Sequence, residues 1–430
     1  MEPVLETTPV PPAPPGRAAP TGAAERITAL DVLRGLCLLG VVAVNLLFLS
    51  GPGERIFLAP FAESPDPWAL RLTVFLFMGK AYALLAFLFG AGFALQAERL
   101  AFRGVRPGPV LLRRFLSLAA IGLAHGLLVW SGDILVLYGL LALLLLAFLR
   151  RRRRTVGILA LALPAANAAL FAAFAGALAL AARLSPDGTS AFAVEMAEEA
   201  ARTVEESLRA YGEGPLGLLF AHRARELLRQ LGNGLAASPQ ILGLFLAGVW
   251  AARRGLLREP AAHGRLLARA AVLLGAAGLA GEIVHLRLVA HGSERLPHML
   301  AGQALHLLSA PALALGAGAA ALVALSTRRG LRALSWLAPL GRTTLTSYLA
   351  QSVLFTTVFY FYGGGLYGRV GPAVCLALAV ATWLAQAAVA RAWLERFRMG
   401  PAEALWRRLT YGSLARALPA PGPPDTDGRR

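Results

Sequence analysis

The chain has little charge, few cysteines and a single lysine. Of its 430 residues 15% are charged, against about 25% in a typical soluble domain, so the composition argues against an ordinary soluble enzyme. Two cysteines exclude a disulfide scaffold and a multi-cysteine zinc site. Lys80 is the one lysine among 42 basic residues, so arginine accounts for nearly all of the positive charge behind the formal net charge of +18.

Apolar residues make up 57% of the chain. They gather in runs close to the ~20 residues that an α-helix needs to cross a bilayer. These runs predict an all-α fold, a polytopic integral membrane bundle of about ten transmembrane helices. The predicted spans cover residues 29–50, 77–97, 111–131, 133–149, 156–182, 232–252, 267–289, 299–325, 338–361 and 371–393.

The spans divide the chain into two membrane domains of five helices each. The end segments are rich in proline or alanine and lack apolar periodicity, so they are predicted to be disordered tails. The segment between the two halves is rich in acids and arginines, which predicts an extracytoplasmic helical region. Its second part, Leu216 to Leu231, is amphipathic, which favours a helix that lies on the membrane surface. The boundaries are 1–25 for the first tail, 26–183 and 232–416 for the membrane domains, 184–231 for the extracytoplasmic segment and 417–430 for the second tail.

Arginines alternate between the predicted loops. With a cytoplasmic N-terminus, the inner loops hold most of them and the short outer loops hold few. This is the pattern of the positive-inside rule. It predicts that both termini are cytoplasmic and that the protein is a multi-pass protein of the bacterial inner membrane. It also explains the net charge without a nucleic-acid partner. The inner clusters fall within residues 99–114, 150–154, 253–269, 328–342 and 391–416.

Polar residues follow one stripe of the first predicted span. Asp31 and Arg34 are one turn apart, and Asn45 follows Arg34 by eleven residues, which returns to within about 20° of the same helix face. Such groups inside a bilayer usually face the bundle interior. They mark either a functional stripe, or an ion pair at the helix end together with an interhelical hydrogen bond from the asparagine.

A histidine and an aspartate flank the tight turn between the third and fourth spans. His125 lies in the outer part of its helix, and Asp133 begins the next one. A carboxylate that holds an imidazole is a common way to fix a catalytic base. The alternative is that Asp133 only caps its helix and that His125 makes an isolated polar contact.

The remaining candidate groups lie near the outer ends of the spans. Lys80 is about one membrane thickness from the inner end of its helix, and we interpret it as a side chain that snorkels to the outer interface. Four histidines, His285, His291, His298 and His306, gather around the predicted outer loop between spans seven and eight. They show no HxH or HExxH spacing, so no metal site is predicted. Walker A, nucleophile-elbow and Rossmann motifs are absent from the sequence.

Several motifs, taken in order, resemble the YeiB-like family of bacterial membrane proteins, whose C-terminal part is domain of unknown function 418. The resemblance covers residues 26–412. The family is itself distantly similar to transmembrane acyltransferases such as heparan-glucosaminide N-acetyltransferase. The motifs are Asp31-Val32-Leu33-Arg34-Gly35 with Asn45, Leu88 to Gly92, His125 with Gly132-Asp133-Ile134-Leu135, Gly341 to Ser352, and Gly400 to Tyr411.

This resemblance implies transfer of an acyl group from cytoplasmic acyl-CoA, with acetyl-CoA as the expected donor, to an acceptor at the outer face. Unlike the similar acyltransferases, the chain has no histidine between Asn45 and Lys80, so the role of catalytic base would fall to His125. The expected catalytic residues are His125, Asp133 and Asn45, and the expected cofactor-binding residues are Asp31, Arg34, Lys80 and Arg342.

Two other functions stay open at this point. One is a transporter or a carrier of a lipid-linked substrate, and the other is a non-catalytic membrane scaffold. The implied partners are membrane lipid and a small-molecule, saccharide or lipid-linked acceptor, without nucleic acid. The sequence does not fix whether the chain forms a homo-oligomer.

Overall fold

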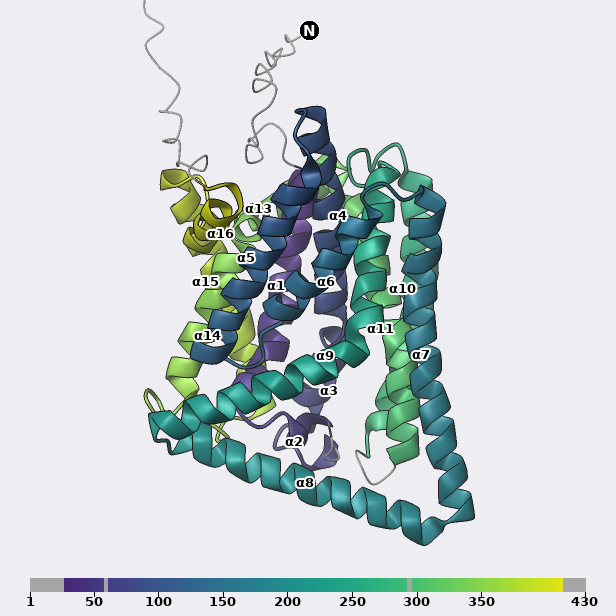
Figure 1. Cartoon of the computed structure of the whole chain (residues 1–430), viewed down its shortest axis with the longest axis vertical. Coiled ribbons are helices and arrows are strands. Elements are labelled where there is room, and N and C mark those ends of the chain that lie inside the picture. The colour runs from purple at the N-terminus through teal and green to yellow at the C-terminus, as the bar shows by residue number, and fades with distance from the viewer. Residues whose placement is uncertain (1–26, 58–60, 292–295, 413–430) are drawn as a thin grey trace, which may run out of the picture.

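The computed structural model describes residues 27–57, 61–291 and 296–412. The two predicted tails, 1–25 and 417–430, lie outside the described residues. Within the described ranges every regular element is a helix, so the all-α prediction is confirmed. The helices are long and stand side by side as a bundle, with one helix, α8 (Pro186–Gly212), lying across one end (Figure 1).

Eight helical stretches in the described part of the chain are long and apolar enough to cross a membrane. The chain is therefore a multi-pass membrane protein by helix length and composition. These stretches are α1 (Thr28–Leu49), α3 and α4 (Pro67–Leu76 and Lys80–Phe102), α5 (Pro107–Leu128), α7 (Arg153–Leu184), α9 (Leu216–Arg253), α10 (Gly264–Val289), α11 (Leu296–Leu325) and α15 (Pro372–Arg396).

Two of the ten predicted spans are shorter helices. The span predicted at 133–149 contains α6 (Leu135–Leu145) and the 3₁₀ turn η2 (Leu146–Phe148). The Asp133 carboxylate accepts a hydrogen bond from the Val136 amide at 3.0 Å in the first turn of α6. The span predicted at 338–361 is divided into α13 (Ala338–Arg342) and α14 (Thr344–Phe359). The smaller remaining elements are α2 (Glu54–Phe57), η1 (Phe61–Glu63), α12 (Arg328–Leu334), η4 (Ser335–Leu337) and α16 (Pro401–Tyr411).

The sixth predicted span and the surface helix before it form one element. The sequence placed a surface helix over Leu216 to Leu231 and a separate span from residue 232, but α9 runs through both as a single bent helix (Figure 1). Pro239 lies inside α9. A proline lacks the amide hydrogen that would bond to the preceding turn, and this allows the helix to bend. The first half of α9 therefore runs obliquely below the bundle and the second half stands within it.

The bundle has two chemically different ends. α13 and α16 lie at one end, and α8 lies across the opposite end (Figure 1). The connections at the first end hold the arginine runs around residues 150–154 and 253–258. We call it the inner end, because the positive-inside rule predicts that arginine-rich connections face the cytoplasm. The extracytoplasmic segment predicted from the sequence corresponds to α8 and the first half of α9.

Glycines allow α4 and α9 to cross with their backbones in contact. A Cβ atom at Gly90 would overlap the carbonyl oxygen of Phe245, and a Cβ at Gly248 would overlap that of Phe87. Helices in a membrane gain little from hydrophobic burial against each other, so close backbone packing at small residues is a main source of their association. Phe245 fills the centre of the core beside this crossing and stacks on Phe89, with ring centroids 4.9 Å apart.

We expect Gly90→Ala to destabilise the protein by about 1–3 kcal/mol, the usual cost of overpacking, because the added methyl group meets backbone that cannot rotate away. Gly176→Ala on α7 is the matched control, since a Cβ there meets no other atom within 4 Å. The control should be neutral or slightly stabilising. Unfolding followed by tryptophan fluorescence in detergent measures both. Equal stability of the two variants would contradict the close crossing.

Candidate functional site

A large cavity extends along the interior of the bundle. Its volume is about 1160 Å³. Along α1 it is lined from Asp31 near the inner end to Asn45, a distance of roughly 21 Å at 1.5 Å per residue. Beyond Asn45 it continues to the turn between α5 and α6 and to the ends of α8 and α14, which belong to the outer end of the bundle. The predicted polar stripe on the first span thus faces this cavity.

Arginines surround the inner part of the cavity. Among the described residues that line it, six arginines lie at the inner end, whereas the acids there are Asp31 and Glu403. This excess of positive charge in a partly enclosed space suits an anionic group. The six are Arg34, Arg99, Arg114, Arg258, Arg342 and Arg407.

Several of these guanidinium groups are held in place by named contacts. Arg34 bonds to Asp31 at 3.0 Å, as the sequence predicted from their spacing of one turn. Arg114 lies over the Trp406 ring at 3.6 Å from its centroid. Arg342 donates to the carbonyl of Arg398 at 3.2 Å. These contacts orient the guanidinium groups at the cavity wall, and a guanidinium fork is a donor group that suits an anionic ligand.

The motifs that support the family resemblance meet at this inner end. A Cβ at Gly341 would overlap the backbone carbonyl of Asp31, and one at Gly35 would lie 2.5 Å from the Leu337 carbonyl oxygen. Glycine is therefore needed at both positions for α1 and α13 to approach. The first and fourth motifs, far apart in the sequence, form one surface beside the cavity.

The last motif completes the same surface. The Glu403 carboxylate accepts hydrogen bonds from the amides of Leu345 and Thr346 at 2.8 and 3.2 Å, and from the Thr346 hydroxyl at 2.5 Å. These amides lie in the first turn of α14, where backbone N–H groups have no helical partner and a negative charge is favourable. Tyr411 at the end of α16 accepts a hydrogen bond from Gln96 of α4 at 2.7 Å. Thus α16 closes the inner end between α4, α5 and α14.

The Glu226 carboxylate lines the outer end of the cavity and is the centre of a hydrogen-bond network there. Glu226 of α9 accepts hydrogen bonds from the hydroxyls of Ser131, at 2.6 Å, and Tyr211. His222, one turn before it, brings its Nε2 to 3.2 Å from the other carboxylate oxygen. Burial raises the pKa of the Tyr211 phenol well above its ordinary value, and neighbouring Tyr360 and Glu226 raise it further. Tyr211 is therefore a neutral donor at physiological pH.

The structure brings His125 and Asp133 together as predicted, since Nδ1 of the histidine lies 2.7 Å from the carboxylate. A carboxylate accepts hydrogen bonds, so Nδ1 is the donor in this contact. The Nε2 atom of His125 is buried without a partner in the described structure, and neither residue is among those that line the cavity. Asp133 instead reaches the cavity through Tyr348, whose hydroxyl donates to it at 3.4 Å.

Lys80 does not snorkel to the interface, and that interpretation is wrong. The side chain is 6% exposed. Its ammonium bonds to the Glu282 carboxylate of α10 and donates to the Val74 carbonyl at 3.2 Å. Lys80 is not among the residues that line the cavity, so it does not join Arg34 and Arg342 there as a predicted cofactor contact. The cause is the acidic partner on a distant helix, which no local pattern around Lys80 reveals.

The sequence reasoning missed Glu226, His222 and Glu282. For the first pair a signal existed, because His222 and Glu226 are four residues apart on an amphipathic helix and such residues share a helix face. The amphipathic pattern of this segment also favours a membrane-surface helix, which would leave both residues outside the cavity. Asn45 lines the cavity, and within the described ranges its side-chain amide makes no hydrogen bond to another protein group. The predicted interhelical bond of Asn45 is thus not formed.

Comparison with known proteins gives related chains of similar length. A family model described as "Protein of unknown function (DUF418)" matches residues 251–413. "Uncharacterized protein YxaH" of Bacillus subtilis is 31% identical over 410 residues, covering 91% of this chain and 96% of its own. "Uncharacterized protein YeiB" of Escherichia coli is 28% identical, covering 92% and 98%. A 39.9 kDa protein encoded beside an amylase in Bacillus acidopullulyticus is 26% identical, covering 90% and 94%.

We expect Glu403→Ala to destabilise the chain by about 1–3 kcal/mol, because it leaves buried donors at the start of α14 without an acceptor. Glu395→Ala is the control, because that carboxylate is exposed and lies 3.8 Å from the Arg391 guanidinium. An exposed ion pair of this kind contributes at most about 1 kcal/mol to stability. Thermal unfolding in detergent compares them. Equal unfolding temperatures for the two variants would show that Glu403 does not hold the inner end in place.

Proposed function

The chain belongs to the YeiB/DUF418 family, and from the cavity it encloses we propose that it is a transmembrane acyltransferase. It would move an acyl group from acyl-CoA on the cytoplasmic side to an acceptor at the outer face. The observation that carries the proposal is one continuous cavity with arginines at its inner end and the hydrogen-bonded Glu226 at its outer end. The location that follows is the bacterial cytoplasmic membrane.

The inner end suits the phosphate groups of the donor. Guanidinium forks bind phosphate with paired, charge-assisted hydrogen bonds. Arg34, Arg342 and Arg114 line this part of the cavity from three different helices. Asp31 would act through its 3.0 Å bond to Arg34 and position it. The thioester arm would then extend past Gly92 and Asn45 toward the outer end.

Acyl transfer needs a base for the acceptor and donors for the oxyanion. In the proposed step the acceptor oxygen or nitrogen bonds to the thioester carbonyl carbon, and its proton passes to the Glu226 carboxylate. The C–S bond then breaks, and the proton moves on to the departing thiolate, which leaves as free CoA thiol. The Asn45 amide is placed to donate to the oxyanion, where a preorganised donor is most effective.

This assignment changes the base predicted from the sequence. Glu226 lines the cavity, whereas His125 and Asp133 lie behind its wall. We therefore propose that the His125–Asp133 pair positions Tyr348, whose hydroxyl bonds to Asp133. The acceptor class follows from the outer location of Glu226: a hydroxyl or amine of a saccharide, a small molecule or a lipid-linked compound.

Transport of an anionic solute is the second candidate. The observation that favours it is the same cavity, which extends from the inner arginines to the outer carboxylate. In a transporter the arginines would bind the solute and no group would be transferred. Uptake into proteoliposomes in the absence of any acyl donor would support it. A scaffold that binds neither donor nor solute is the third alternative.

For the acyltransferase we expect Glu226→Gln to lower acyl transfer by about 10²–10⁴-fold, the usual contribution of a general base. Glu205→Gln on exposed α8 is the matched control and should keep full activity. The assay incubates purified protein with acetyl-CoA radiolabelled in the acetyl group, plus candidate sugar and amine acceptors, and measures labelled product and free CoA.

His125→Ala separates the two assignments of the base. A loss as large as that of Glu226→Gln would restore the sequence-based prediction. A smaller loss with an unchanged pH profile fits a positioning role through Tyr348. Full activity of Glu226→Gln would remove Glu226 as the base, and no CoA release with any acceptor would count against acyl transfer.

A further inference from the structure

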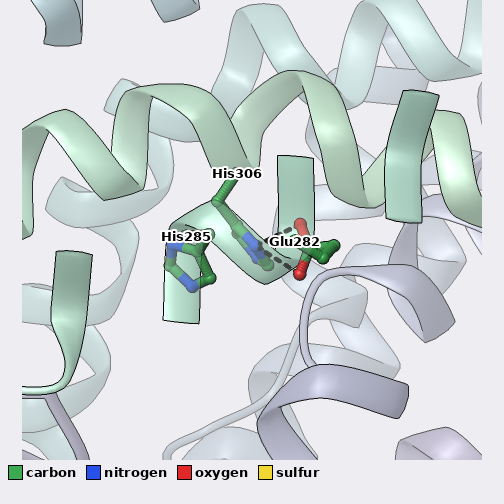
Figure 2. A group of neighbouring side chains, drawn as sticks. All are labelled: Glu282, His285 and His306. Carbon is green, nitrogen blue, oxygen red and sulfur yellow. Dashed lines mark hydrogen bonds and ion pairs between the residues drawn. The ribbon is translucent and has the colours of Figure 1, made fainter. Parts of the chain in front are cut away.

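A second group of polar side chains is buried between α10, α11 and the start of α4, outside the cavity wall. It contains Glu282, His285, His306, Ser309 and Lys80, each less than 10% exposed. Figure 2 shows the two imidazoles beside each other, with Glu282 facing His306. Polar and ionisable groups at this depth in a membrane protein are costly and usually have a function.

We propose that Glu282, His285 and His306 form a binding site for one divalent transition-metal ion of the zinc class. Each residue offers one ligand atom, and these three atoms all lie within 4.8 Å of one another. Two histidines and one glutamate are a ligand set that Zn²⁺ uses when it keeps a fourth position for water or substrate. The ligands lie on two helices, α10 and α11, so they form no compact metal motif in the sequence.

The surroundings of these ligands are those of a metal site. Nδ1 of His285 lies 2.9 Å from the Gly302 carbonyl, so Nδ1 donates there and Nε2 has a free lone pair. Ser309 donates to Glu282 at 2.6 Å. Ligating imidazoles and carboxylates are typically oriented by such outer hydrogen bonds, which fix the tautomer and the ring plane.

The group is next to the cavity, and Gly79 separates the two. Gly79 lines the cavity with a positive φ of 79°, and a Cβ at this position would overlap Nε2 of His306. The left-handed backbone and the close imidazole both require glycine here. The proposed ion would therefore lie behind Gly79, directly beside the cavity wall.

The Lys80 ammonium lies beside the proposed metal ligands and competes with an ion for Glu282. This ammonium forms an ion pair with Glu282, which is 0% exposed. A divalent ion would meet that ammonium as a like charge at short range. Lys80 therefore weakens metal binding and preserves the charge balance of the cluster when the ion is absent. Replacement of Lys80 should therefore tighten Zn²⁺ binding, a result that is not expected if the ion pair has only a structural role.

The test titrates Zn²⁺ into the chelator-treated full-length protein in nanodiscs and follows heat and bound metal. We expect one Zn²⁺ per chain and at least about tenfold weaker binding in His285→Ala and in His306→Ala, since even outer-shell changes cost 10–100-fold. His298→Ala is the matched control, because His298 is exposed on the same helix as His306. It should bind as the parent chain does.

Lys80→Met adds the discriminating measurement. Removing a like charge beside the ion should tighten Zn²⁺ binding about tenfold or more. X-ray absorption of the Zn²⁺-loaded parent chain needs no variant and should show two imidazoles and oxygen ligands. Absence of Zn²⁺ binding, equal binding in His306→Ala and His298→Ala, or a spectrum without imidazole would each overturn the site.

Discussion

The contact between the backbones of α1 and α13 is the constraint on which the inner end depends. Gly341 lies directly on the carbonyl of Asp31, and any side chain there would separate the two helices. Glu403 then fixes α14 through the free amides of its first turn. Segments from three distant parts of the sequence are thereby held together. Their arginines converge on one cavity only because these contacts are made.

Local features of the fold and the site could be predicted from the sequence. Eight of the ten predicted spans follow from apolar length, whereas the runs at 133–149 and 338–361 form shorter helices. Asp31 meets Arg34 because one helix turn separates them, and His125 meets Asp133 because a tight turn joins their helices. In each case the residues are close in sequence, so the local geometry of helix and turn fixes the contact without knowledge of the bundle.

Contacts between distant helices could not be predicted in this way. The sequence placed Lys80 at the interface because its partner, Glu282, is 202 positions away on α10. Glu226 reaches the cavity because α9 bends back over the outer end, whereas a surface helix would have kept it in the interface. His125 also lies behind the cavity wall, where its ring packs beside Tyr348 of the distant helix α14.

The central claim is that a donor bound at the inner arginines extends through the bundle as far as Asn45. Its most direct test uses a chain with Cys37 and Cys375 replaced by alanine and the substitution Asn45→Cys, in membranes of known orientation. A membrane-impermeant maleimide is applied from the outer face while acetyl-CoA is added at the inner face. The account predicts that Cys at this position is labelled and that acetyl-CoA slows the labelling. Labelling that acetyl-CoA leaves unchanged at every concentration would contradict it.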